Sequence, residues 1–242
     1  MIVLAICQLR GSVDEEAPHL ARETHTAIYD ARLKLAQPPP IIALRTTMRS
    51  DAEALRASLG QRGHEVVLCD EESVTAPTPV RAFRFGDDAF ETDVGSLPGR
   101  FSYADIVALV RASRTSHTET TKRVTERKLR PVAAVVTGGL ILSKKVTHEE
   151  KGATHHREDL LYVFSRDGRA ALVSERGTVY ASLRDVAPTQ RENFMRVVSE
   201  LRSRAPHAAF DERLLGHRTL EDRELDLRAY VLFVAELDRI RG

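Results

Sequence analysis

The spacing of apolar residues over the first 70 positions predicts an α/β order. Short apolar runs predict strands at 2–9, 41–44 and 66–68. Between them, apolar residues recur at helical spacing up to residue 36 and again from residue 50. The polar run Thr24-His25-Thr26 predicts a break in the first helical stretch, because such residues form helices weakly. We expect a small sandwich of the order strand-helix-helix-strand-helix-strand.

Residues typical of helix ends support this division. Ser12 with Glu15, and Ser50 with Glu53, have the spacing of capping boxes. Gly63 supplies the left-handed residue that ends the third helix. The face of the helical stretch before residue 36 that we expect to be buried includes Ala27, Ile28, Ala31 and Leu35.

Two segments of this region resemble a known family. The run DAEALRASLGQRGHEVVLCD, residues 51–70, is similar to the last helix and strand of the C-terminal domain of the bacterial ribosomal stalk protein. The Clp-protease adaptor shares that fold, and its last helix also tends to end in Gly-His. The preceding AIYDARLKLAQPPP is similar to the stalk helix that runs into a proline-containing loop. The resemblance implies a domain over residues 1–70 whose relatives grip partner proteins with helix surfaces. The stalk domain's glycine-rich turn and lysine-rich factor-binding face have no counterpart here, so binding of translation factors is not implied.

Residues 71–79 are polar with two prolines and predict a linker to a second domain, 80–242. There the pattern changes to period two, with hairpin turns at Gly86-Asp87-Asp88 and Asp167-Gly168 and a further strand at 178–183. Thr189 with Glu192 opens a capped amphipathic helix, and a last helix is expected over 221–240.

A long polar hairpin is expected within this second domain, at about 112–159. Five threonines between 115 and 125 favour extended chain. Apolar strands are expected at 132–136 and 140–142. One interpretation pairs the polar stretches as arms of a ribbon, and the alternative is two disordered loops.

The order of elements after residue 80 resembles the pleckstrin-homology superfamily. That resemblance implies a bent antiparallel sheet or barrel closed by C-terminal helices, which makes the whole chain α+β. The last helix contains AYVLFVAEL, residues 229–237, which is apolar almost all round. Such a helix must be buried, either on its own domain or at an interface with a copy of the chain or a partner.

Composition excludes few classes of protein. The 242 residues carry a formal net charge of +1, so the whole chain is not strongly attracted to nucleic acid or acidic lipid. Cys7 and Cys69 each lie in an apolar run, where a free cysteine behaves as a small core residue. No apolar run reaches the roughly 20 residues of a membrane-spanning helix, and the N-terminus lacks a basic leader. We therefore expect a cytoplasmic protein.

The one charged segment that is a candidate for ligand binding lies at 111–130. It holds seven basic residues and two acidic ones, a balance of +5. Such a segment can bind phosphate groups or an acidic protein face, although charge on exposed strands also prevents aggregation. The basic residues are Arg111, Arg114, Lys122, Arg123, Arg127, Lys128 and Arg130.

Candidate chemistry is otherwise sparse. The sequence has no phosphate loop, nucleophile elbow or Cys-x-x-Cys motif, and we expect no cofactor. His148, His155 and His156, with neighbouring carboxylates, are the best metal candidates, but adjacent histidines on a strand face opposite sides. We expect a non-enzymatic adaptor or scaffold that binds protein. The alternatives are a binder of nucleic acid or anionic lipid through 111–130, and a metal-dependent enzyme using 148–159.

Overall fold

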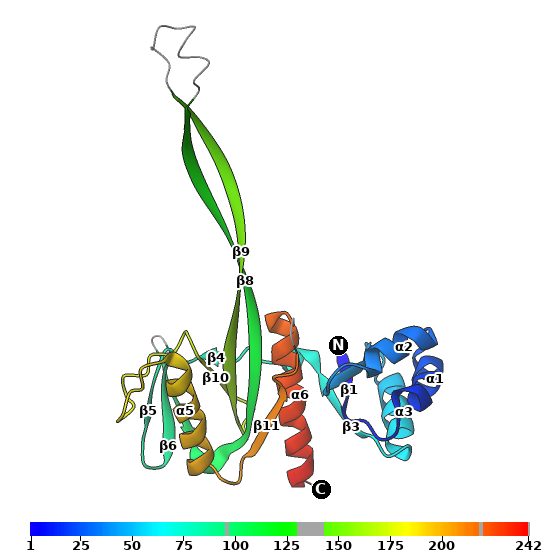
Figure 1. Cartoon of the computed structure of the whole chain (residues 1–242). Coiled ribbons are helices and arrows are strands. Elements are labelled where there is room, and N and C mark those ends of the chain that lie inside the picture. Colours follow the sequence, from blue (N-terminus) through cyan, green and yellow to red (C-terminus); the bar gives the residue numbers. More distant parts are fainter. Residues whose placement is uncertain (95–96, 130–142, 218–219, 242) are drawn as a thin grey trace. The chain divides into compact units, whose positions relative to one another are not determined.

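The chain has an α+β fold with three sheets, none of them closed into a barrel (Figure 1). A computed structural model describes residues 1–94, 97–129, 143–217 and 220–241. Side chains are described except at 94, 97–98, 116–129 and 143–156. The chain divides into two compact units: residues 1–114 with 158–242, and residues 115–157.

The first sheet has the order β2-β1-β3, with both outer strands antiparallel to β1. The expected order of elements over residues 1–70 is confirmed. Helices α1 to α3 share one core with the sheet, which includes Leu4, Leu20 and Leu59. The elements are β1 (Ile2–Gln8), α1 (Val13–Thr24), α2 (Ile28–Leu35), β2 (Ile41–Thr46), α3 (Arg49–Gln61) and β3 (Glu65–Asp70).

The helix ends confirm most of the predicted boundaries. The capping box of Ser12 and Glu15 is present, and Gly63 has a φ of +84°. His25 adopts a φ of +53° and separates α1 from α2, as its polar neighbours predict. The capping box at Ser50 is wrong: α3 begins at Arg49, so Ser50 lies in its first turn. The N-cap residue is Met48, whose side chain makes no capping hydrogen bond.

The second sheet has five strands in the order β11-β8-β9-β10-β4. It is mixed, since β11 runs parallel to β8 and β4 runs parallel to β10, whereas β9 and β10 are antiparallel. The sequence predicts an antiparallel sheet and does not predict the two parallel edge strands, β4 and β11. The strands are β4 (Thr78–Pro79), β8 (Ile106–Leu129), β9 (Ser143–Ser165), β10 (Ala170–Ser174) and β11 (Ala209–Leu214).

The third sheet is an antiparallel meander, β5 (Ala82–Phe85), β6 (Ala89–Val94) and β7 (Leu97–Ser102). Short 3-10 turns precede β4 (η1, Glu71–Ser73) and β8 (η2, Tyr103–Asp105). Helix α5 (Gln190–Arg204) has the predicted capping box of Thr189 and Glu192. It buries Phe194 and Leu201 against a core that also contains Phe90 of the meander and Leu161 of the second sheet.

Helix α6 (Asp222–Arg241) lies between the first and second sheets (Figure 1). Its Phe233 belongs to one core with Val3 and Cys69 of the first sheet and Tyr162 of the second. A helix between two apolar faces must be apolar on both sides, which explains residues 229–237. Helix α6 thus packs on its own predicted domain, one of the two expected alternatives, and also on the first sheet, which neither alternative included. The segments on either side of the predicted 71–79 linker thus share a core.

The two long strands β8 and β9 are hydrogen-bonded neighbours in the second sheet, the pairing on which the ribbon interpretation depends. The strands predicted at 132–136 and 140–142 lie outside the described residues. The strand predicted at 178–183 is wrong: this segment forms turns, and the Tyr180 hydroxyl donates to the carbonyl oxygens of Ser174 and Glu175. None of the described helices combines the length and the apolar character needed to cross a membrane.

Candidate functional site

Arg111, at the start of the predicted basic segment, lies inside an ion-pair cluster. Its guanidinium is 2.6 Å from Asp159 on β9 and 2.8 Å from Glu212 on β11. Burial alone would lower the pKa of Arg111, but the hydrogen bonds and charges of these two carboxylates raise it. Because two carboxylates surround it, Arg111 stabilises the fold and offers little charge to a ligand.

Arg114 is paired in the same way on the other face of the sheet. Its guanidinium is 2.9 Å from Glu158 on β9 and 3.1 Å from Asp222 at the start of α6. Burial lowers the pKa of Arg114, but the hydrogen bonds and charges of these two carboxylates outweigh this effect, so the pKa is raised overall. Two of the seven residues proposed as a basic patch therefore have structural partners that the sequence did not indicate.

The other candidates for anion or metal binding are not described at the side-chain level. Lys122, Arg123, Arg127 and Lys128 lie on β8, and His148, His155 and His156 lie on β9, with side chains outside the described set; Arg130 lies outside the described residues altogether. Among the side chains that are described, no three His, Cys, Asp or Glu residues converge as a metal site. The basic patch and the metal site remain predictions.

Charge is nevertheless divided unevenly between the two units. Residues 115–157 contain nine Lys or Arg and four Asp or Glu, a formal charge of +5. The whole chain carries +1, so the remaining residues carry −4. The backbone of β8 and β9 places both basic arms of this segment on one two-stranded ribbon.

A buried charged network occupies the end of the first sheet. His64, whose side chain is 1% exposed, accepts the Arg10 backbone N–H at Nδ1 (2.9 Å) and donates from Nε2 to Glu16 (2.9 Å). Arg62 binds Glu16 and also Glu23, each at 2.8 Å. Burial raises the pKa of Glu23, but hydrogen bonds from Arg62 and Ser58 outweigh it and lower the pKa overall. With its ring almost fully buried, His64 joins α1 and the Arg10 backbone to the turn that follows α3, and it is not placed for catalysis.

Helix α2 exposes the largest apolar side chains of the first sheet's helices. Tyr29 is 68% exposed, and Ile28 and Leu33 are each 52% exposed. The apolar spacing predicts that Ile28 lies on the buried face, which is wrong because the break at His25 starts a new helix with a different rotation. Large apolar residues that lie together on a surface are typical of protein-binding sites. We call Ile28, Tyr29 and Leu33 the α2 surface.

Contacts with the core, with α1 and with β2 fix the position of the helix that carries the α2 surface. Ala31 and Leu35 are buried in the core of the first sheet. Arg32 pairs with Asp14 of α1 at 2.9 Å, and the Lys34 ammonium donates to the carbonyl oxygen of Ala43 on β2 at 3.1 Å. The exposed side chains therefore sit on a fixed helix, which lowers the entropy cost of binding through them.

Comparison with known proteins assigns no family to this fold. The resemblances of residues 1–70 to stalk and adaptor domains, and of residues 80–242 to the pleckstrin-homology superfamily, therefore remain predictions. No protein-family model, curated protein or solved structure matches this chain.

Proposed function

We propose that this chain is a non-enzymatic, cytoplasmic protein that binds other proteins as an adaptor or scaffold, and that the α2 surface is a contact site. The observation that carries the proposal is the exposure of Ile28, Tyr29 and Leu33 on one short, fixed helix. Tyrosine is enriched among the residues that dominate binding energy at interfaces. The resemblance of residues 1–70 to domains that grip partners with helix surfaces supports the same role.

The partner expected at this surface offers an apolar pocket to Tyr29 and Leu33. These residues are four apart on α2 and so project from the same side of the helix. The charged neighbours Arg32 and Lys34 are already bound to Asp14 and to the Ala43 carbonyl. Apolar contact, and not charge, should therefore dominate the affinity at this surface.

The test compares proteins captured from native lysate by the full chain and by its variants. Tyr29→Ser with Leu33→Ser should reduce the capture of at least one partner tenfold or more. Val179→Ser with Ile240→Ser, which changes two other exposed apolar residues (58% and 57% exposed), serves as the matched control and should capture the same set as the unchanged chain. Identical capture by all three proteins would remove the α2 surface from the proposal.

A second candidate function is binding of nucleic acid or anionic lipid by the ribbon. The uneven charge favours it, because +5 lies on residues 115–157 and −4 on the rest. Replacing Lys122, Arg123, Arg127 and Lys128 with glutamine should abolish binding to duplex DNA or to phosphatidylserine vesicles, whichever binds. The affinity of the unchanged chain should fall steeply with salt. Equal binding by the variant would contradict this function.

A further inference from the structure

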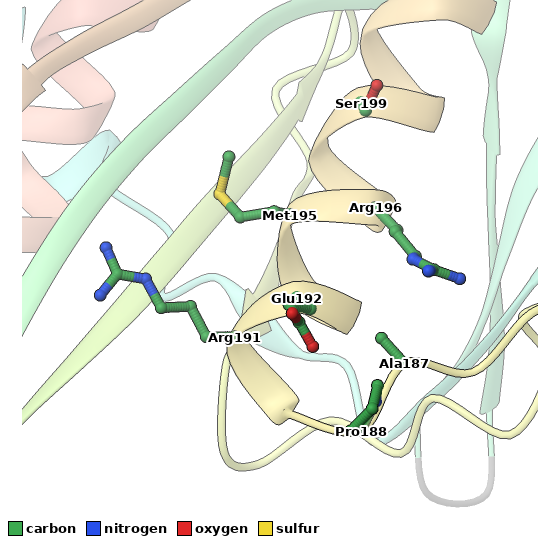
Figure 2. A pocket seen from close by; sticks show the side chains of 7 residues that line it. All are labelled: Ala187, Pro188, Arg191, Glu192, Met195, Arg196 and Ser199. Atoms are coloured by element: carbon green, nitrogen blue, oxygen red, sulfur yellow. The ribbon is translucent and has the colours of Figure 1, made fainter.

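The outer face of α5 is hollowed where the helix begins. Pro188 and Ala187 lie at one end of the hollow, and Arg191 and Met195 project from the helix beside it (Figure 2). Arg196 projects to the other flank of α5. Met195, which is 37% exposed, is an apolar side chain between charged ones.

A second hollow continues along the same helix. Met195 and Ser199 line both hollows, and the second adds Arg202 and Phe210. Arg191, Met195 and Arg202 are spaced i, i+4 and i+11, which places them in one row along α5. At 1.5 Å per residue, the two arginines stand about 16 Å apart along the axis, roughly the length of five extended residues. We call this the α5 groove.

The walls of the α5 groove are fixed by hydrogen bonds. The buried side chain of Asn193 accepts the N–H of Ala187 (2.6 Å) and donates to its carbonyl oxygen (3.0 Å). Arg196 donates to the carbonyl oxygen of Asp185. The loop before α5 is therefore attached to the helix at two points, and the groove exists before any ligand binds.

The positive charges of the groove are available, whereas its carboxylates are engaged. Glu192 accepts hydrogen bonds from the N–H and hydroxyl of Thr189, and Glu212 pairs with Arg111 at 2.8 Å. Arg191 makes no ion pair with any described residue. The Arg202 guanidinium lies over the Phe210 ring, 4.0 Å from its centre, with its edges left for hydrogen bonds.

We propose that the α5 groove binds an extended acidic segment of a partner protein. A side-chain carboxylate at each end of about five residues would meet Arg191 and Arg202, and an apolar side chain between them would cover Met195. The apolar centre distinguishes this site from one for a bare phosphate group. The inference rests on the proposed function, protein binding, but concerns a different surface from α2.

The test uses a phage-displayed library of random 12-residue peptides selected on the full chain. Enriched peptides should combine Asp or Glu with an apolar residue. Measured by fluorescence anisotropy, their affinity should fall at least tenfold for Arg191→Glu with Arg202→Glu, and for Met195→Asp. Arg10→Glu with Arg166→Glu makes the same change of charge at exposed arginines elsewhere and should leave the affinity within twofold.

Several results would overturn the inference. These are selection of no peptide, selection of peptides without acidic residues, and equal affinity for the groove variants and the control. Binding of phosphatidylserine vesicles that Arg191→Glu with Arg202→Glu abolishes, with peptide binding unchanged, would assign the groove to lipid instead. Tyr29→Ser with Leu33→Ser should not affect peptide affinity, so failure here and failure of the α2 proposal are distinguishable.

Discussion

A guanidinium nitrogen of Arg111 lies 2.6 Å from a carboxylate oxygen of Asp159 on the neighbouring strand, and each side chain is 11% exposed. The preceding residue of β9, Glu158, pairs with Arg114 on the opposite face of the sheet. Towards the centre of the sheet, the following residues of β9 are apolar and buried, beginning with Leu160 and Leu161. Ion pairs therefore flank the buried core on both faces of the sheet, at the point on β9 where the run of apolar residues ends.

Breaking one of these pairs should destabilise the chain. Asp159→Ala leaves Arg111 with Glu212 alone, and loss of one partner from a largely buried pair typically costs about 3 kcal/mol. Urea unfolding followed by circular dichroism measures the change. Asp167→Ala, which removes an exposed pair with Arg169 at the same 2.6 Å distance, should cost less than about 1 kcal/mol. Equal effects of the two substitutions would contradict the role given to Arg111.

A double-mutant cycle separates the pair from its surroundings. Arg111→Met in the Asp159→Ala background should cost less than Arg111→Met alone, because the single substitution leaves the buried Asp159 carboxylate without this cation. A coupling of about 1 kcal/mol or more is expected for groups in contact. Strict additivity would show that the two side chains act independently.

The features that were predicted correctly depend on residues close together in the sequence. The capping boxes at Ser12 and Thr189, the break at His25, and the turns after Phe85 and Ser165 all depend on residues within a few positions of one another. The failures depend on distant contacts. Strand β11 was missed because AFDERL is half polar, and it forms by pairing with β8, about 100 residues earlier.

The candidate surfaces were harder to predict for the same reason. The sequence counts Arg111 and Arg114 as free positive charge, but their carboxylate partners come from 44 to 108 residues away. Exposure of Ile28 depends on how α2 is rotated against the sheet, which spacing alone misjudged. The row of Arg191, Met195 and Arg202 follows from helical spacing, so a search of α5 for its outward face would have found it.

Stability should fall on acidification because of His217. Burial lowers the pKa of His217, the nearby Arg228 cation lowers it further, and its weak contact with the Pro39 carbonyl oxygen (3.4 Å) opposes this only in part. The folded state therefore binds fewer protons than the unfolded state. The contribution of His217 to the free energy of unfolding is fully present above its unfolded-state pKa of about 6.5. It is lost as the pH falls towards the lower pKa of His217 in the folded chain.

His217→Gln should reduce this pH dependence. We expect a smaller drop in unfolding free energy between pH 7.5 and pH 5.5 than in the unchanged chain, measured by urea titration at each pH. His207→Gln, at an exposed position on the α5–β11 connection, is the matched control and should keep the original slope. The same slope in all three proteins would show that His217 titrates normally.

Asn193 should control the loop that borders the α5 groove. Asn193→Ala leaves the buried N–H and carbonyl oxygen of Ala187 without partners, a loss of about 2 kcal/mol. Limited trypsin digestion should then cut faster after Arg184, in the loop before α5. Gln190→Ala, an exposed change in the first turn of the same helix, should leave the digestion rate unchanged. Unaltered cleavage in Asn193→Ala would mean that this side chain does not fix the loop.

The shared core around α6 predicts that the first sheet does not unfold independently. Cys7 and Cys69 are buried, and burial raises the pKa of each thiol to about 12, so a thiol reagent at pH 8 should label them only after unfolding.

Phe233→Ala removes a ring that stacks on Phe164 at 4.8 Å and should cost about 3–5 kcal/mol. Labelling of both cysteines should shift to lower urea together with the circular dichroism signal of the whole chain. Ile240→Ala, which is exposed, should shift neither. If Phe233→Ala moved the circular dichroism transition and left the cysteine labelling midpoint in place, residues 1–70 would be an independent domain, as the sequence alone predicts.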